Sequence, residues 1–537
     1  MSGEPVKRAR SDSEQLFVQN IVAEAVTIFV AIVFGVVSSI LVVRGLPTVP
    51  VYEFYIYILV FAWVSVLIPV GIMGIDVALM KHVPEVVNRR SLSFYRLIGW
   101  SVVASLLASL GIVVLVNLVL AWFPPGVLIP VGVLPFLQLA LLTVPLTAVS
   151  TVLQGIFRGL QRMRYVTYAM ALYHGLYFVA LTTIFVLGIM TLLGVIVFNI
   201  VVSVVTIIFE VVVLFVVLRR PPRNLTVGSW SSTRRSFIST ASQAFLLALL
   251  GAVFLYIPLL IANVFRTSNL MLAGLGLAMS VAVYIQRGQA APFRVLMPRT
   301  SGDMAQEGSS AIRGYMDRAW KLGLLFSAFI AVGVVFYAAP VLVVFFAVEG
   351  LVATPFLVLM AGSFLIYPLT ALMMDTLIGV GSIRAVLVTY AAWTGSIILL
   401  LWLFCPVAHE IVVALIWLAG IPFLLIFLLL FQRRTGIQVT GRFIPRTIGV
   451  LVVIALLFLI VIMFGWFVLT LWNLVGMLAW VFQVVMILTL GPLSIFYLWS
   501  LRKTRVLEPV DVTALLRMSE VLHPLSKPVS WLIERMD

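Results

Sequence analysis

Charged residues are scarce in this chain of 537 residues: only 10% are Asp, Glu, Lys or Arg, whereas 63% are hydrophobic. A soluble domain carries roughly 25% charged residues, so the composition excludes an ordinary soluble protein and indicates a polytopic membrane protein. Acidic residues are the scarcer sign, with 19 against 34 Lys and Arg, and the net charge is +15. In a membrane protein this excess belongs to cytoplasmic loops under the positive-inside rule. Nucleic acid is therefore not expected as a partner.

Groups suited to enzymatic or metal chemistry are also few. A single cysteine, Cys405, excludes a disulfide framework and a cysteine metal cluster. The glycine-containing stretch 155–159 ends a helix and does not form a nucleotide loop. The predicted outer loops offer only dispersed acids and one histidine: Glu53, Glu349, His409 and Glu410. We therefore expect no enzyme, no catalytic residue, no metal and no cofactor beyond a coupling H⁺ or Na⁺.

Long apolar runs predict the fold class, an all-α polytopic membrane protein. A spanning helix needs about 20 mostly apolar residues, and fourteen such runs follow one another along the chain. They are 21–43, 54–80, 97–122, 131–157, 165–187, 192–218, 237–264, 270–297, 320–346, 353–380, 386–404, 411–431, 448–471 and 474–499. With both termini in the cytoplasm, all Lys and Arg fall in inside segments except Arg44 and Arg266. This asymmetry supports the count of fourteen transmembrane helices.

An internal repeat divides these spans. The stretch 153–168, LQGIFRGLQRMRYVTY, has an echo 222 residues later that aligns Gly159 with Gly381 and Arg162 with Arg384. Six spans per half is an even number, so the two six-helix lobes are predicted to be parallel, related by an axis along the membrane normal. The predicted organisation is a cytoplasmic tail 1–20, an N-lobe 21–218, a linker 219–236, a C-lobe 237–432, two further helices in 433–500 and a cytoplasmic or interfacial tail 501–537.

Three stretches carry a family resemblance. They are Gly74 to Leu79 with Lys81 and Pro84, Leu153 to Tyr165, and Met297-Pro298 followed by Ser301 and a basic segment to Lys321. With the 6+6+2 topology they resemble the multidrug/oligosaccharidyl-lipid/polysaccharide (MOP) exporter superfamily, within it the polysaccharide flippase (Wzx-type) branch. The resemblance implies two lobes flanking a cavity. It also implies that a polyprenyl-linked oligosaccharide, typically joined through a diphosphate, is turned from the cytoplasmic to the outer leaflet.

The arginines inside the apolar spans are the candidate substrate-binding residues, since a charge at mid-membrane costs about 2.5–3.5 kcal/mol on insertion scales. Arg287 lies ~9 Å inward from the centre of its span at 1.5 Å per residue, beside Gln286 and Gln289. Its planar fork suits a diphosphate, although a structural ion pair is the alternative. Arg294 either snorkels to the cytoplasmic face or extends the same basic path.

Arg44 and Arg266 form a second pair of candidates. They occupy equivalent positions at the outer ends of the first and seventh spans, where they could receive the diphosphate after transfer. Ordinary anchoring at the membrane interface is the alternative.

The acidic residues within the spans are candidates for ion coupling. Glu24, Asp76 and Asp375 are the three proposed here. A local pair with Lys81 is an alternative for Asp76, and stabilisation of the C-lobe is one for Asp375. Glu210 is expected to face the interior of its bundle, and His174 to be a packed, hydrogen-bonded residue.

The sequence thus predicts a flippase of lipid-linked oligosaccharide that works by alternating access in the plasma membrane. Its expected partners are the lipid-linked oligosaccharide, membrane lipids and glycosyltransferases of the same pathway. A MATE-like exporter of drugs or cations is the first alternative, disfavoured by the two extra spans and Arg287. A membrane-embedded glycosyl- or acyltransferase is the second, disfavoured by the dispersed outer acids.

Overall fold

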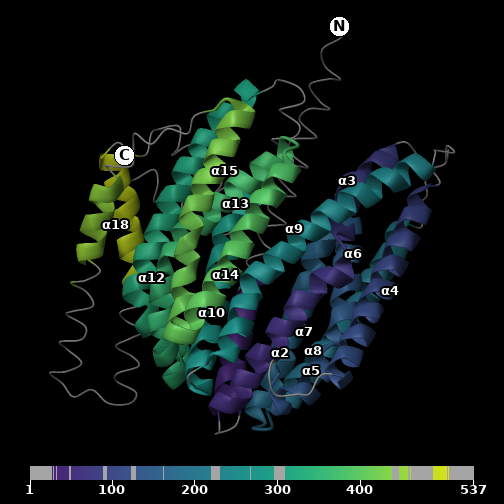
Figure 1. The fold of residues 1–537 in the computed structure, drawn as a ribbon, viewed down its shortest axis with the longest axis horizontal. Helices are drawn as coiled ribbons and strands as arrows, with labels where there is room; N and C mark the ends of the chain where they lie inside the picture. Colours follow the sequence, from purple (N-terminus) through teal and green to yellow (C-terminus); the bar gives the residue numbers. More distant parts are fainter. Residues whose placement is uncertain are drawn as a thin grey trace. The chain divides into compact units, whose positions relative to one another are not determined.

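The chain is all helical wherever the structure describes it, and no strand occurs in that part (Figure 1). The structure is a computed structural model. It describes residues 27, 30–31, 33–46, 50–88, 93–122, 129–160, 162–218, 230–266, 268–294, 309–437, 447–457, 460, 488–504 and 506.

Ten helices within these ranges are long and apolar enough to cross a membrane. One of them, Ile383–Thr435, has 53 residues and covers two of the predicted spans, 386–404 and 411–431. The predicted first and thirteenth spans are represented by the short apolar helices Val33–Gly45 and Thr447–Leu457. The remainder of those two spans lies largely outside the described residues. A multi-pass membrane fold is therefore confirmed, whereas the count of fourteen stays a prediction.

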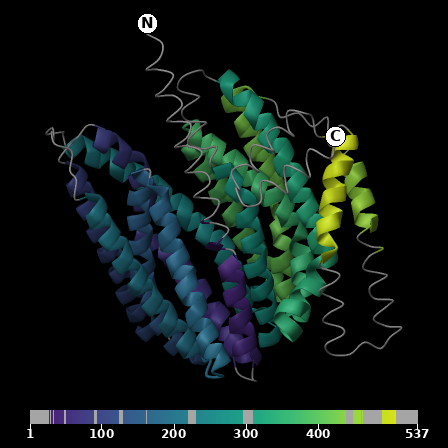
Figure 2. The same cartoon turned by 180° about the vertical axis from the view of Figure 1, so that it is seen from behind.

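The first of two compact units, here the N-terminal unit, comprises Ala23–Gly276 and Ile383–Ile416. Within it, α6 packs against most of its neighbours, and α9 packs against α2, α3 and α14. Figure 2 shows these helices from behind as long rods in purple to blue-green. The helices are α2 (Pro50–Ile72), α3 (Ile75–Asn88), α4 (Ser93–Trp122), η1 (Val131–Val133), α5 (Leu134–Ala140), α6 (Thr143–Gly159), α7 (Met163–Val186), α8 (Leu192–Leu218), α9 (Trp230–Val264), the start of α10 (Asn269–Arg294) and α14 (Ile383–Leu415).

The C-terminal unit includes Leu277–Ser382 and the chain from Trp417 onward. Its helices are the rest of α10, α12 (Ser309–Leu359), η2 (Met360–Gly362), α13 (Ser363–Gly379), η3 (Ile416–Ala419), α15 (Gly420–Thr435) and α18 (Leu490–Lys503). Here α13 packs against α12 and α15, and the Tyr497 hydroxyl donates to the Leu325 carbonyl at 2.9 Å. These units cut the chain at other points than the predicted lobes, which remain a prediction.

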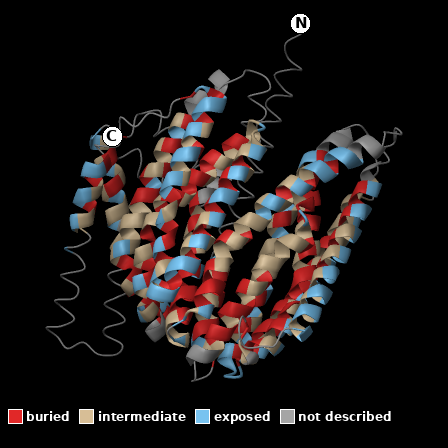
Figure 3. Ribbon diagram, viewed as in Figure 1, coloured by how far each residue is buried: buried red, intermediate tan, exposed pale blue. Residues whose placement is uncertain are grey.

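The surface of α4 shows why this sequence needs a membrane. Ser101, Ser105 and Ser109 recur every four residues and are fully buried, and Ser105 donates to the Gly71 carbonyl of α2 at 3.0 Å. The exposed residues of α4, pale blue in Figure 3, include Leu107 and Trp122 at 64% and 84% exposure. Small residues inside and large apolar residues outside is the arrangement of helices packed in lipid.

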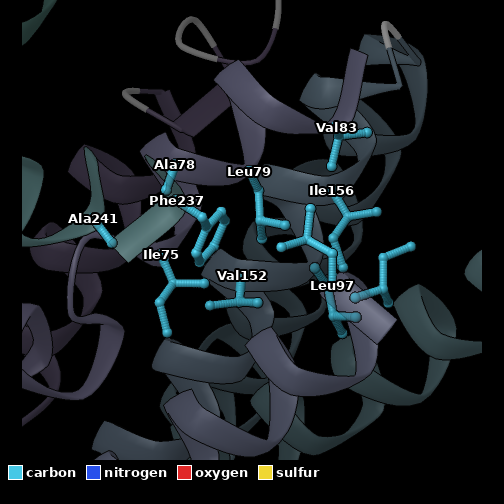
Figure 4. Packing of buried hydrophobic residues seen from close by; sticks show 11 residues of the cluster. Ile75, Ala78, Leu79, Val83, Leu97, Val152, Ile156, Phe237 and Ala241 are labelled. Atoms are coloured by element: carbon cyan, nitrogen blue, oxygen red, sulfur yellow. The ribbon is translucent and has the colours of Figure 1, made fainter. Parts of the chain in front are cut away.

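A core cluster joins three parts of the N-terminal unit (Figure 4). Phe237 of α9 packs with Leu79 of α3 and Val152 of α6, and each of the three is at most 1% exposed. The close packing depends on small residues, since a Cβ at Gly155 of α6 would lie 2.8 Å from the Cα of Asp76. The core thus fixes α3 and α9 against α6.

Three spans that the sequence predicts as continuous are interrupted. The span 54–80 breaks at Met73 and Gly74, whose φ angles are 55° and 66°. The span 131–157 breaks between α5 and α6, and 353–380 tightens into the 3₁₀ segment η2. The left-handed region costs about 1–2 kcal/mol for a residue with a Cβ, so the break at Gly74 needs glycine.

A local repeat is visible in the helices around the predicted elbow. Both α6 and α13 have 17 residues, and each ends in a turn in which a backbone N–H reaches five residues back. Arg162 donates to the Phe157 carbonyl at 2.9 Å, and Ser382 to the Leu377 carbonyl at 2.8 Å. The helix starts, Met163 and Ile383, are 220 residues apart. This offset pairs Arg384 with Arg164, two residues from the pairing that the sequence suggests.

Candidate substrate and coupling sites

The polar face of α10 holds the first group of candidate residues. Gln286 and Gln289 are three positions apart, so they share one side of the helix, and they are 1% and 2% exposed. The Gln286 Nε2 donates to the Ser363 Oγ at 2.9 Å. Ser363 in turn donates to the Met360 carbonyl at 2.6 Å. This face of α10 is therefore held at the junction of η2 and α13.

Most of the hydrogen-bonding capacity of these two amides is unused. The Gln286 Oε1 and both amide atoms of Gln289 are buried and have no partner among the described residues. A buried polar atom without a partner costs about 1–3 kcal/mol, and in native proteins it points to a water, an ion or a ligand. The α10 face thus offers one donor group and two acceptors to a polar molecule.

Arg287 and Arg294 lie on the same helix. Arg287 stands between the two glutamines in sequence, and Arg294 is the last residue of α10. Their side chains lie outside what the structure describes. The structure places both in the helix predicted for them, and their contact with substrate stays a prediction.

The outer arginine of the seventh span, Arg266, is fixed by a hydrogen-bonded network. Its Nη1 donates to the backbone carbonyl and the Oδ1 of Asn263 at 2.8 and 3.1 Å, and its Nε donates to the Asn269 Oδ1 at 3.1 Å. The Tyr55 hydroxyl donates to the same Asn263 Oδ1 at 2.9 Å. The guanidinium also lies 5.5 Å from the centre of the Tyr55 ring.

This network leaves one end of the guanidinium for a ligand. Asn263 and Tyr55 are each 1% exposed, whereas Arg266 is exposed. No hydrogen bond within the described part of the chain uses its Nη2. A side chain held in one rotamer loses less entropy when it binds an anion. Arg44, its predicted counterpart, is also exposed, near the end of the helix Val33–Gly45.

Replacing Asn263 with leucine should weaken this network. The variant removes the acceptor shared by Tyr55 and Arg266 and leaves the Tyr55 hydroxyl buried, which costs about 1–3 kcal/mol. We expect a lower melting temperature in detergent and weaker binding of an anionic ligand. Asn117→Leu is the matched control, because the Asn117 side chain bonds only to the Val113 carbonyl of its own helix. Equal melting temperatures of Asn263→Leu and wild type would contradict the role of the network.

The predicted coupling acids are not brought together within one unit. Glu24 lies outside the described residues. Asp76 is in the first turn of α3, and its electrostatic partner is Arg158 of α6. The suggested pair with Lys81 is not formed, since Lys81 is exposed and no ion pair joins the two. Asp375 is half-buried on α13 in the other unit.

Glu210 of α8 is a functional candidate that the sequence did not rank. It is fully buried, with 0% exposure. Its Oε1 accepts from the Ser150 Oγ at 3.0 Å and from the Gln154 Nε2 at 2.9 Å, both on α6. The signal was present in the sequence as an acid inside a long apolar helix. Its partners could not be assigned from spacing, because α6 and α8 are about 60 residues apart.

Metal binding finds no support in the described residues. No group of three or more His, Cys, Asp or Glu side chains is close enough there to hold a metal ion. The buried polar groups are amides, hydroxyls and single carboxylates, which suit hydrogen-bonded ligands and protons.

Comparison with known proteins identifies the fold. A MOP superfamily transporter from Pyrococcus furiosus matches with a TM-score of 0.60 and 14% identity, over 78% of this chain and 95% of that one. A multidrug resistance MATE family transporter of the MOP superfamily, in an outward-facing conformation, matches with a TM-score of 0.60 and 15% identity over the same shares.

A third solved structure, a mutant of the MATE transporter VcmN from Vibrio cholerae, gives a TM-score of 0.57 at 15% identity, over 79% of this chain and 97% of that one. No family model matches the sequence, and no curated protein matches it significantly. The chain therefore has the fold of MOP superfamily transporters of the MATE type. The structures that it resembles are transporters and not enzymes.

Proposed function

We propose that this protein moves a polyprenyl-linked oligosaccharide from the cytoplasmic to the outer leaflet by alternating access. The observation that carries the proposal is the polar face of α10. Gln286 and Gln289 keep three buried amide atoms unpaired on the helix that also bears Arg287. A sugar diphosphate carries both chemical groups that this helix can bind, hydroxyls and a dianion.

In this mechanism the diphosphate binds Arg287 and Arg294 from the cytoplasmic side. Charge-assisted bonds from a guanidinium fork to phosphate are about twice as strong as neutral ones and fix orientation. The amides of Gln286 and Gln289 hydrogen-bond sugar hydroxyls. After the conformational change, Arg266 and Arg44 receive the diphosphate at the outer face, Arg266 through the Nη2 group that its network leaves available.

The polyprenyl tail stays in the bilayer throughout. Helix α4 presents large apolar side chains to lipid, such as Val114 at 59% and Leu118 at 53% exposure. Moving only the headgroup through protein avoids moving a long hydrocarbon chain through a polar path. The energy comes from an ion gradient, the membrane potential or the substrate gradient.

A second candidate function is export of drugs or cations, favoured by the structural likeness to multidrug MATE transporters. The Pyrococcus furiosus relative is described as having a binding pocket of reverse polarity that suggests a different function. The charge of the pocket is therefore what discriminates between substrates on this fold. The intramembrane arginine of α10 favours an anionic substrate over a cationic one.

The proposed setting is the plasma membrane, with both termini in the cytoplasm and glycosyltransferases of the same pathway as partners. The glycosyl- or acyltransferase alternative has no comparable support. The catalytic acids that it requires remain dispersed, with Glu53 in the first turn of α2 and Glu410 in α14.

A binding experiment separates the two candidate substrates. The purified protein in lipid nanodiscs is offered a lipid-linked oligosaccharide diphosphate and a lipophilic cation, and bound species are counted by native mass spectrometry. We expect the sugar lipid to bind and inorganic diphosphate to compete with it. Retention of the cation without the sugar lipid would overturn the proposal.

A further inference from the structure

A buried polar stripe runs along α8 in the N-terminal unit. Asn199, Ser203, Thr206 and Glu210 follow one another at intervals of four, three and four residues, which places them on one face of the helix. They are 8%, 7%, 3% and 0% exposed. The rest of α8 is almost wholly aliphatic or aromatic, and its exposed residues, such as Ile208 and Val212, are apolar.

The neighbouring helix α6 carries a stripe with the same intervals. Its members are Thr143, Thr147, Ser150 and Gln154. The two helices pack against each other, and the stripes meet where Ser150 and Gln154 bond to Glu210. At the other end of the α8 stripe, the Asn199 Nδ2 donates to the Tyr173 hydroxyl of α7 at 3.1 Å. The interior of this bundle therefore contains a continuous run of hydrogen-bonding groups.

Glu210 differs from the other members because it can be charged. Its Oε1 accepts two hydrogen bonds, and its Oε2 is buried without a partner. It lies eight residues before the end of α8, about 12 Å along the helix at 1.5 Å per residue. An ionised carboxylate in such a place is stable only beside a cation.

The structure shows no cation beside Glu210. The hydrogen bonds to its carboxyl come from neutral side chains, Ser150 and Gln154, and no charged side chain interacts with it. The helices that pack against α8 carry other titratable groups, none of which is among its partners. They are Arg158 on α6, Arg164, Tyr165, Tyr168, Tyr173, His174 and Tyr177 on α7, and Glu53, Tyr55 and Tyr57 on α2.

We infer that Glu210 is the proton-binding carboxyl of the N-terminal unit and that its proton is the coupling ion for transport. The protonated acid satisfies burial without a counter-ion, and the hydroxyl and amide donors on Oε1 leave Oε2 to carry the proton. A hard metal cation requires about six oxygen ligands. Here the neighbours are one hydroxyl, one amide that presents its nitrogen, and the Met170 sulfur 3.9 Å from that nitrogen. Such a site favours a proton over Na⁺.

This inference rests on the proposed transport for its coupling role, but protonation of Glu210 can be tested without transport. Infrared difference spectra of the protein in nanodiscs report the C=O stretch of protonated carboxylic acids. We expect a band at neutral pH that disappears at alkaline pH and is absent from Glu210→Gln, whose amide keeps the shape of the acid. Glu53→Gln is the matched control, because Glu53 also has a buried carboxylate oxygen without a partner but is not a member of the stripe.

The coupling is tested in proteoliposomes. With wild type, an imposed pH gradient should accelerate transfer of lipid-linked oligosaccharide. Glu210→Gln should lose this acceleration and retain slow exchange down the substrate gradient, while Glu53→Gln keeps both. If no variant transfers substrate but the band titrates, the proposed substrate is wrong and the proton site stands. An unchanged band in Glu210→Gln, or a band removed by Na⁺ at constant pH, would overturn the inference.

Discussion

Arg287→Ala is expected to abolish transfer of lipid-linked oligosaccharide while leaving the fold intact. Arg287 lies on α10 between Gln286 and Gln289, whose amides already face a polar ligand or water. Removing the guanidinium removes at least two charge-assisted hydrogen bonds to diphosphate. Each is worth about 1.5–3 kcal/mol, so affinity should fall by about a hundredfold or more at 1.4 kcal/mol per tenfold. The measurement is the rate of transfer in proteoliposomes together with substrate affinity in nanodiscs.

Two further variants separate charge from packing. Arg287→Lys keeps the charge but not the fork, so it should bind substrate weakly and retain part of the transfer. Arg384→Ala removes an exposed arginine at the start of α14 and should behave as wild type. A fully active Arg287→Ala protein, or loss of transfer in Arg384→Ala, would be incompatible with a substrate site on α10.

Gly74→Ala is expected to have the largest effect on stability. Gly74 has a φ of 66°, and a Cβ there would lie 2.3 Å from the Ala241 carbonyl oxygen and 2.4 Å from the Phe245 nitrogen, both backbone atoms of α9. The left-handed conformation costs about 1–2 kcal/mol, and overpacking adds about 1–3 kcal/mol. The N-terminal unit should therefore lose about 2–5 kcal/mol of stability. Melting temperature in detergent, read by size-exclusion fluorescence, measures the loss.

The control for this variant is a glycine of ordinary helical geometry. Gly111 of α4 has no atom within 4 Å of the position where a Cβ would stand. Alanine there should leave the melting temperature unchanged or raise it, since alanine is favoured by up to about 1 kcal/mol in helices. If Gly74→Ala melts with wild type, the close approach of the α2–α3 break to α9 is not maintained in the membrane.

The positions of the helices were largely predictable, because burial in lipid imposes long apolar runs. Their interruptions were not. Met73 and Gly74 stand in an apolar stretch that a hydropathy pattern cannot divide, and the break follows from the backbone of α9, which is far away in sequence. The repeat was visible in the sequence, but identical residues suggested a register of 222 residues where the helix starts give 220. Apolar sequences permit such slips, since many residues match by composition alone.

The candidate site was predictable in part for a related reason. An arginine or glutamine within an apolar helix is conspicuous, so Arg287 and Gln286 could be selected from sequence. Hydrogen bonds between distant segments were not accessible in this way. The pairing of Asn263 with Tyr55 and of Glu210 with Gln154 depends on tertiary packing, which turns an exposed-end arginine and an isolated acid into organised groups.

Transbilayer movement of the substrate tests the central claim most directly. Purified protein is reconstituted into liposomes with a fluorescent polyprenyl-diphosphate oligosaccharide, and a membrane-impermeant reagent quenches whatever reaches the outer leaflet. We predict that wild-type protein makes nearly the whole pool accessible, whereas liposomes without protein or with Arg287→Ala expose only the half that began outside. Equal accessibility with and without the protein, under a pH gradient and without one, would contradict the assignment as a flippase.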